Sequence, residues 1–142
     1  MKQLSIEHVE YIAHHLAKKI MGWDEPIPDF STRYPGKLES CLKTPFQSFA
    51  KRDLYPTLED KSAILFYLMI KNHPFQNGNK RIAVTSLLTF LSMNQKWLKI
   101  PPDELYGLAI WVAESRPLAK DGTVQAIKDY MKKYLIEWRK TL

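Results

Sequence analysis

The chain has 142 residues, of which 45% are hydrophobic and 25% charged, a composition typical of a folded globular protein and not of a disordered one. Its formal net charge of +6 favours anionic partners such as nucleotides, nucleic acids or an acidic protein. A single cysteine, Cys41, excludes an internal disulfide. The length predicts one domain covering residues 1–142.

The N-terminal residues give no sign of export or membrane insertion. Met1 to Glu7 lacks the apolar core of a signal peptide. The longest apolar run in the chain is too short to cross a bilayer. We therefore expect a cytoplasmic protein without a membrane partner.

The first predicted element is an amphipathic helix. Ser5 is a suitable N-cap, and the helix is expected to run to about Met21. One face is apolar at helical spacing, and it consists of Ile6, Val9, Ile12, Ala13, Leu16, Ala17 and Ile20.

Two irregular stretches and a short helix follow. Residues 23–36 contain three prolines and read as a loop, with an extended piece expected at Phe30 to Tyr34. A short helix is predicted over about 37–43, and residues 44–56 read as a second irregular region.

The next helix is predicted to be the buried centre of the fold. Thr57 and Asp60 have the spacing of a capping box at its start. Residues 63–70 are apolar on every side, as expected for a fully buried helix. The helix should end near His73, because Pro74 cannot continue it.

Three further helices complete the predicted all-α fold. The first runs to about Asn94, and a connector covers residues 95–102. Asp103 is expected to cap a helix over about 103–115. The last helix is predicted from about Thr123 to Arg139, with one apolar face formed by Val124, Ile127, Met131, Leu135 and Trp138.

The two most apolar helices are joined by the polar segment HPFQNGNKR at residues 73–81. Gly78 permits a backbone shape that other residues resist, and Asn79 is a good N-cap for the following helix. The start of that helix has unpaired N–H groups beside Lys80 and Arg81, a combination that favours phosphate. The planar guanidinium of Arg81 suits phosphate oxygens better than the lysine does.

His73 and Phe75 have different expected roles in this segment. Most histidines at a helix C-terminus only interact favourably with the helix dipole. With an anion site close by in the sequence, His73 is better interpreted as a general base that takes a proton from an attacking hydroxyl. Phe75 is expected to anchor the loop in the core.

This segment resembles the signature loop of the Fic/Doc family, roughly H-x-F-x-D/E-G/A-N-G/K-R. Eight of the nine positions of 73–81 fit, and the exception is Asn77, where the family has an acidic residue. Residues 35–42 also resemble the G-x-L-E-S-A-L stretch of Doc-type proteins. The resemblance covers about residues 4–98, and it implies the helical Fic/Doc fold.

The same resemblance implies a transferase that uses ATP, with Gly78, Asn79, Lys80 and Arg81 at the nucleotide phosphates. AMP-transferring relatives usually have glycine where this chain has Lys80, and the death-on-curing branch has lysine. Lys80 therefore implies phosphoryl transfer to a hydroxyl side chain of a target protein, with a translation factor as the expected target.

Asn77 implies a weaker metal site. The family's acidic residue holds the metal that bridges the nucleotide phosphates, and Mg²⁺ binds best through charged carboxylates. Phosphoryl transfer depends heavily on that metal. We therefore expect Mg²⁺ to bind more weakly through Asn77, and turnover to be slower than with aspartate.

The resemblance also concerns partners. The region 26–36 corresponds in position to the family's flap, so Ser31, Thr32, Arg33 and Tyr34 are expected to contact the target. The inhibitory pattern S/T-x-x-x-E-G/N is absent from the chain, and restraint is therefore expected from a separate antitoxin protein, as in a toxin–antitoxin pair.

Three alternatives remain at this stage. One is AMP transfer, against which Lys80 argues, and another is a catalytically degenerate binding protein, which Asn77 favours. The third is a helical DNA-binding protein, suggested by the sequence pI of about 9.4. The predicted helices contain no helix-turn-helix pair with a basic recognition face, so nucleic acid is not an expected partner.

Overall fold

The computed structural model describes residues 1–22 and 25–138. The N-terminal helical segment consists of α1 (Ile6–His8), the π-helix η1 (Val9–Ala13) and α2 (His14–Ala17). Five longer helices follow: α3 (Pro35–Lys43), α4 (Leu58–Lys71), α5 (Asn79–Met93), α6 (Pro102–Glu114) and α7 (Lys120–Tyr134). The predicted all-α class is confirmed. None of the helices within the described residues is long and apolar enough to cross a membrane.

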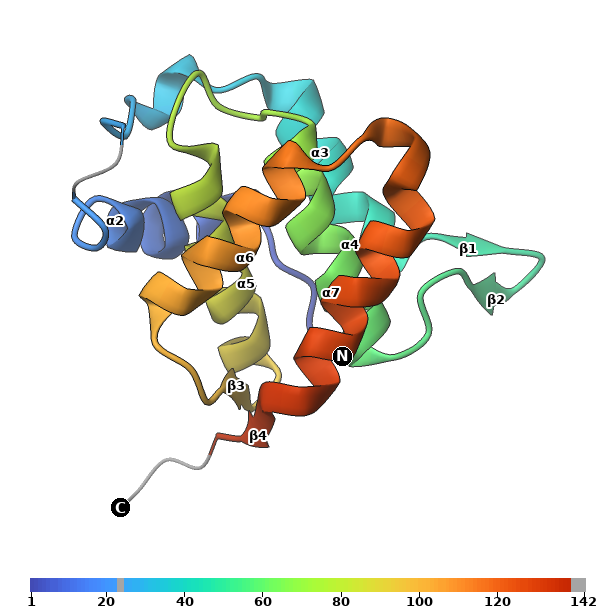
Figure 1. Ribbon diagram of the computed structural model, residues 1–142. Coiled ribbons are helices and arrows are strands. Elements are labelled where there is room, and N and C mark those ends of the chain that lie inside the picture. Colours follow the sequence, from blue (N-terminus) through green and yellow to red (C-terminus); the bar gives the residue numbers. More distant parts are fainter. Residues whose placement is uncertain (23–24, 139–142) are drawn as a thin grey trace.

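Short elements connect these helices. The 3₁₀ turns are η2 (Phe30–Thr32), η3 (Thr44–Phe46) and η4 (Pro117–Ala119). Strands β1 (Ser48–Phe49) and β2 (Arg52–Asp53) form one antiparallel hairpin, which projects from the helical body (Figure 1). Strands β3 (Lys96–Leu98) and β4 (Leu135–Glu137) form a second antiparallel pair.

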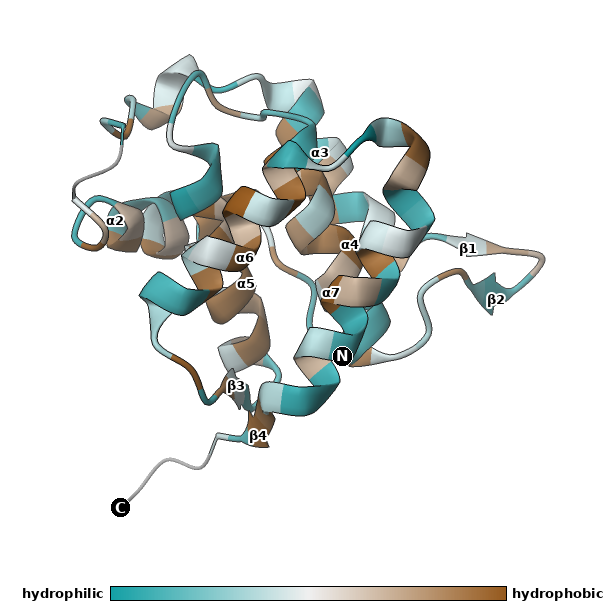
Figure 2. Ribbon diagram, viewed as in Figure 1, coloured by the Kyte–Doolittle hydropathy of each residue, from teal (hydrophilic) through white to brown (hydrophobic). Residues whose placement is uncertain are grey.

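Helix α4 lies at the centre and packs mainly against α5 and α7 (Figure 1). Residues 63–70 are all buried, as the apolar run predicted, and Lys61 and Ser62 before them are buried as well. The predicted capping box is also present, since Thr57 Oγ1 accepts from the Asp60 N–H at 3.1 Å and Asp60 Oδ2 accepts from the Thr57 N–H at 3.2 Å. Figure 2 shows the apolar residues gathered on the inner sides of the helices.

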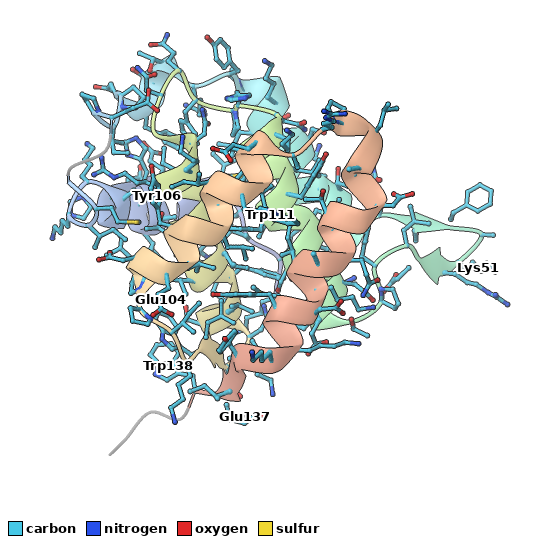
Figure 3. All side chains as sticks on the ribbon, in the orientation of Figure 1. Lys51, Glu104, Tyr106, Trp111, Glu137 and Trp138 are labelled. Atoms are coloured by element: carbon cyan, nitrogen blue, oxygen red, sulfur yellow. The ribbon has the colours of Figure 1, made fainter. Side chains whose placement is uncertain are left out.

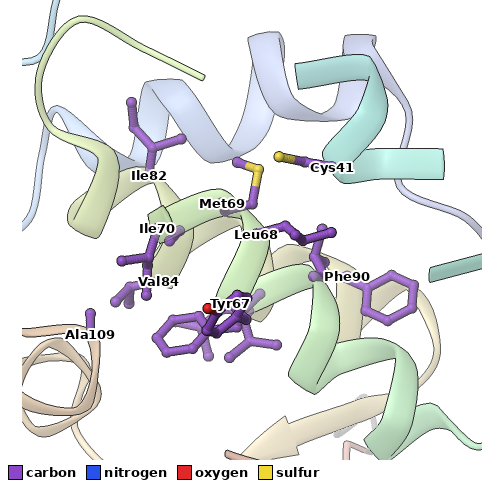
Figure 4. Packing of buried hydrophobic residues seen from close by; sticks show 14 of the residues in the cluster. Cys41, Tyr67, Leu68, Met69, Ile70, Ile82, Val84, Phe90 and Ala109 are labelled. Carbon is purple, nitrogen blue, oxygen red and sulfur yellow. The ribbon is translucent and has the colours of Figure 1, made fainter. Parts of the chain in front are cut away.

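The core extends from α4 to the elements around the polar loop. Met69 of α4 points toward Cys41 of α3 (Figure 4), and Ile82 and Val84 of α5 belong to the same buried core cluster. Burial raises the pKa of the Cys41 thiol to about 11, so this cysteine is a core residue and not a nucleophile. The core therefore fixes both helices that flank residues 72–78.

The N-terminal helix departs from its predicted pattern. Its regular helix ends at Ala17, and Met21 has a φ of 52°. The π-helical turn η1 adds a residue to the spacing of successive turns and rotates the following side chains. As a result Ile12, predicted to be buried, is 47% exposed and lines an apolar surface groove, while His14 is buried.

Three other boundaries also differ from the sequence predictions. The N-cap of α6 is Pro101 and not Asp103. The last helix ends at Tyr134, because residues 135–137 pair with β3 instead of continuing the helix; its predicted end at Arg139 lies outside the described residues. Phe30 to Thr32 form a 3₁₀ turn where an extended piece was predicted, and only the next two residues are extended.

The start of α4 predicts a pH-dependent contribution to stability. Burial raises the pKa of Asp60, but hydrogen bonds from Lys128 and Thr57 outweigh it, so the pKa lies below its ordinary value. The contribution is therefore present above pH 4 or so, the ordinary aspartate range, and is lost as the pH falls through the lowered pKa. We expect Asp60→Ala to reduce the free energy of unfolding by about 1 kcal/mol at pH 7.

This difference should shrink below about pH 3 in urea unfolding curves, where the wild-type carboxylate is protonated as well. Gln125→Ala, which removes an exposed hydrogen bond to Asp129 and no charge, is the control. A difference between wild type and Asp60→Ala that does not change with pH would contradict the electrostatic origin.

Candidate functional site

Residues 72–78 connect the C-terminus of α4 to the N-terminus of α5 in a conformation that places His73 at the surface. Asn72 is the C-cap of α4, and His73 has a φ of 48°. A left-handed backbone at a residue other than glycine is uncommon and costs of order 1–3 kcal/mol, and such strain concentrates at functional sites. The strain at an exposed histidine therefore supports a functional role for this position.

Asn79 organises the loop from inside, and it is not the N-cap that was predicted. The N-cap of α5 is Gly78, with a φ of 72°, and Asn79 is the first helical residue. The buried Asn79 amide accepts from the Phe75 N–H at 3.0 Å and donates to the Phe75 carbonyl at 2.9 Å. One side chain thus satisfies both backbone groups of Phe75, as a short segment of sheet would.

The same amide also contacts His73. The Asn79 Nδ2 atom lies 3.5 Å from His73 Nδ1, a long contact. The contact places the imidazole, a side chain suited to general base chemistry, beside the amide that organises the loop.

Phe75 is 1% exposed and joins a cluster of rings below the loop. Its ring centroid lies 5.8 Å from those of His14 and Phe30. His14 Nε2 donates to the Pro28 carbonyl at 2.8 Å, and burial lowers the pKa of His14, so the ring is neutral. The buried ring of Phe75 thus connects the loop to the core.

Arg81 is buried, although the sequence placed it at a phosphate. It is 3% exposed, its Nη1 donates to the Glu25 carbonyl at 2.8 Å and its Nη2 donates to the Ala17 carbonyl at 2.5 Å. The guanidinium thus connects α5 to the end of α2 and to the segment that starts at Glu25. In this conformation Nη1 and Nη2 each donate to the protein backbone, whereas the buried Nε has no hydrogen-bond partner.

A polar pocket of about 240 Å³ lies beside the loop. It is lined by residues from α4, α5, α6 and two loops: Glu25, Ile70, His73, Gln76, Asn77, Asn79, Lys80 and Ala113. No side chain caps the N-terminus of α5, so its first N–H groups are available at this end of the helix. With Lys80 in the lining, the pocket combines a helix N-terminus, a cation and a histidine, which suits an anion such as phosphate.

Asn77 is hydrogen-bonded to the carboxylate of Glu25, a residue that the sequence analysis did not single out. With its amide nitrogen turned toward its neighbours, Asn77 donates to the Gln76 carbonyl at 3.0 Å and to Glu25 Oε2 at 2.9 Å. Among the described residues no group of three His, Cys, Asp or Glu side chains could hold a metal by itself. A carboxylate and an amide oxygen are nevertheless hard donors that suit Mg²⁺ when phosphate and water supply the other ligands.

The predicted target-binding flap, residues 31–34, lies beside the polar loop, whereas the β1–β2 hairpin does not. Residues 31–34 do adjoin the loop, since the Tyr34 N–H donates to the Pro74 carbonyl at 2.9 Å. Ser31 and Thr32 are exposed, whereas Arg33 donates to the Phe30 carbonyl and stacks over its ring at 4.4 Å. The β1–β2 hairpin, with Lys51 at its tip, points away from the polar loop (Figures 1 and 3).

The turn at Gly78 predicts a local stability effect. A Cβ added there would require a side chain at φ +72° and would meet Ile27 Cδ1 at 2.5 Å. We expect Gly78→Ala to reduce the free energy of unfolding by about 1–2 kcal/mol, the cost of the left-handed conformation, while the tip of Ile27 moves aside.

Urea unfolding followed by tryptophan fluorescence checks this, with Gly107→Ala as the matched control. Gly107 lies within α6 with open space around it, and alanine there should stabilise by about 0.5–1 kcal/mol. Equal effects of the two substitutions would argue against a specific constraint at Gly78.

Comparisons with known proteins identify the family of this chain. The model of the Fic/DOC family matches residues 3–91, and the chain belongs to this family. It is 35% identical over 66 residues to Toxin Doc of Mycolicibacterium smegmatis (strain ATCC 700084 / mc(2)155), which corresponds to 46% of this chain and 51% of that protein. The chain thus spans about half the length of this relative. The search of solved structures found no match.

Proposed function

We propose that this protein is a Doc-like toxin that transfers the terminal phosphoryl group of ATP to a hydroxyl side chain of a target protein. The observation that carries the proposal is the pocket in which His73 faces the uncapped start of α5 and Lys80. Family membership and the similarity to Toxin Doc support the same reading. A target in the translation machinery and an antitoxin partner belong to the proposal.

The proposed step needs few groups from the protein. His73 takes the proton of the target hydroxyl, whose oxygen forms a bond to the γ-phosphorus. The bond from that phosphorus to the β,γ-bridging oxygen breaks, and ADP leaves. The N–H groups at the start of α5 and the Lys80 ammonium stabilise the phosphate charge, which is the main requirement in phosphoryl transfer.

Asn77 lines the pocket and would hold Mg²⁺ near the phosphates through its amide oxygen, more weakly than a carboxylate would. Bound there, Mg²⁺ would neutralise phosphate charge. Arg81 has a supporting part in this proposal, because its donors already hold the Glu25 and Ala17 carbonyls. The extended backbone of Arg33 and Tyr34 lies next to Pro74, and we propose that the target segment approaches along residues 31–34.

The experiment is a transfer assay with ATP labelled at either the α- or the γ-phosphate, using a cell lysate as the source of target. Label on a protein band from γ-labelled ATP alone is the expected result. Label from the α-position alone would establish AMP transfer instead. Absence of protein labelling from both nucleotides, with the folded protein confirmed by its melting curve, would favour a binding protein without catalysis.

A further inference from the structure

We propose that Glu25 supplies the carboxylate for the divalent cation that accompanies the nucleotide, in place of the residue at position 77. The inference rests on the proposed function, since it concerns the same pocket. Its starting observation is that Glu25 Oε2 lies 2.9 Å from the Asn77 amide nitrogen and that both residues line the pocket with His73. The loop itself contains no acidic residue between His73 and Arg81.

The backbone of Glu25 is fixed relative to the loop by contacts from α5. Arg81 Nη1 donates to the Glu25 carbonyl at 2.8 Å from a buried position. Two residues further on, Ile27 packs so closely on Gly78 that a Cβ there would meet its tip at 2.5 Å. The carboxylate of Glu25 is therefore presented to the pocket by a segment held at two points, although it lies about 50 positions from the loop in sequence.

The charges in the pocket give this carboxylate a specific consequence. Lys80 and the start of α5 attract a polyphosphate, whereas an ionised Glu25 repels it. A divalent cation between the carboxylate and the phosphates converts that repulsion into attraction. Nucleotide and cation should thus bind with strong positive coupling, and the coupling should depend on the charge of Glu25.

A purely structural role for Glu25 leads to a different expectation. The hydrogen bond between Glu25 and Asn77 would then only hold the loop. Glutamine could replace Glu25 in that role, because its amide oxygen also accepts a hydrogen bond. Glu25→Gln separates the two roles, since it keeps the shape and the acceptor and removes the charge. The double variant Glu25→Gln with Asn77→Asp has the wild-type net charge and moves the carboxylate to the neighbouring side chain.

The test measures affinity for the non-hydrolysable analogue β,γ-imido-ATP by calorimetry, with Mg²⁺ and with EDTA, and Mn²⁺ binding to the protein–analogue complex by electron paramagnetic resonance. In wild type, Mg²⁺ should strengthen nucleotide binding, and Glu25→Gln should weaken Mn²⁺ binding by about tenfold or more, as for other supporting groups of metal sites. The double variant should recover most of this loss. Glu39→Gln, an exposed carboxylate on α3, is the control.

The outcomes separate this inference from the proposed function. Unchanged Mn²⁺ binding in Glu25→Gln would overturn the inference and leave nucleotide binding intact. Tighter analogue binding in Glu25→Gln by the same factor with Mg²⁺ and with EDTA would overturn it too, because Glu25 would then only obstruct the pocket. Failure of the folded wild-type protein to bind the analogue at all would instead contradict the proposed function, and the inference with it.

Discussion

His73→Ala should lower label transfer from γ-labelled ATP by roughly 10²–10⁴-fold, the range for removal of a general base. The expectation follows from the position of the ring, which is exposed at the pocket on a strained backbone. Its Nδ1 lies 3.5 Å from Asn79 Nδ2 at the start of α5. The affinity for nucleotide should change much less, because the proposed phosphate-binding groups belong to α5 and not to His73.

Two measurements make this prediction specific. His15→Ala removes an exposed histidine on α2 that does not line the pocket, and its transfer rate should equal that of wild type. Melting curves should show that His73→Ala remains folded, since the exposed ring is not part of the core. Full transfer activity in a folded His73→Ala protein would remove His73 from the chemistry and leave the pocket as a binding site only.

The parts of the fold that could be predicted are those determined by local sequence. The capping box of Thr57 and Asp60 and the apolar run of 63–70 placed α4 correctly, since helix starts and buried faces depend on residues within one or two turns. Helix α5 was placed for the same reason, between the break at Pro74 and the end at Asn94. Both helices that position the loop were thus predictable.

The differences arise where residues distant in sequence compete with local preference. Leu135 continues the predicted apolar face of the last helix, yet residues 135–137 pair with β3, about 40 residues earlier. Likewise Arg81 carries the sequence signal of a phosphate ligand, but it lies against the carbonyls of Ala17 and Glu25. Periodicity and motif spacing contain no information on such contacts, and Glu25 stands in a proline-containing loop without any periodic signal.

Arg81→Ala should destabilise the fold by about 3 kcal/mol or more, because hydrogen bonds from a charged donor contribute about 1.5–3 kcal/mol each and two carbonyls lose such a donor. The measurement is urea unfolding followed by tryptophan fluorescence. Arg81→Lys should restore little of this loss, since an ammonium cannot reproduce the planar fork that reaches both carbonyls. The segment beginning at Glu25 should also become more accessible to protease in Arg81→Ala.

Lys80→Ala is the matched comparison, because the adjacent lysine lines the pocket and is only partly buried. It should leave the free energy of unfolding nearly unchanged and weaken β,γ-imido-ATP binding. If instead Arg81→Ala kept full stability and lost nucleotide affinity, Arg81 would be the phosphate ligand that its sequence context suggests. The two neighbouring cations thus have different expected roles. Lys80 adds positive charge to the pocket, and Arg81 holds the backbone of Glu25, whose side chain lines the pocket.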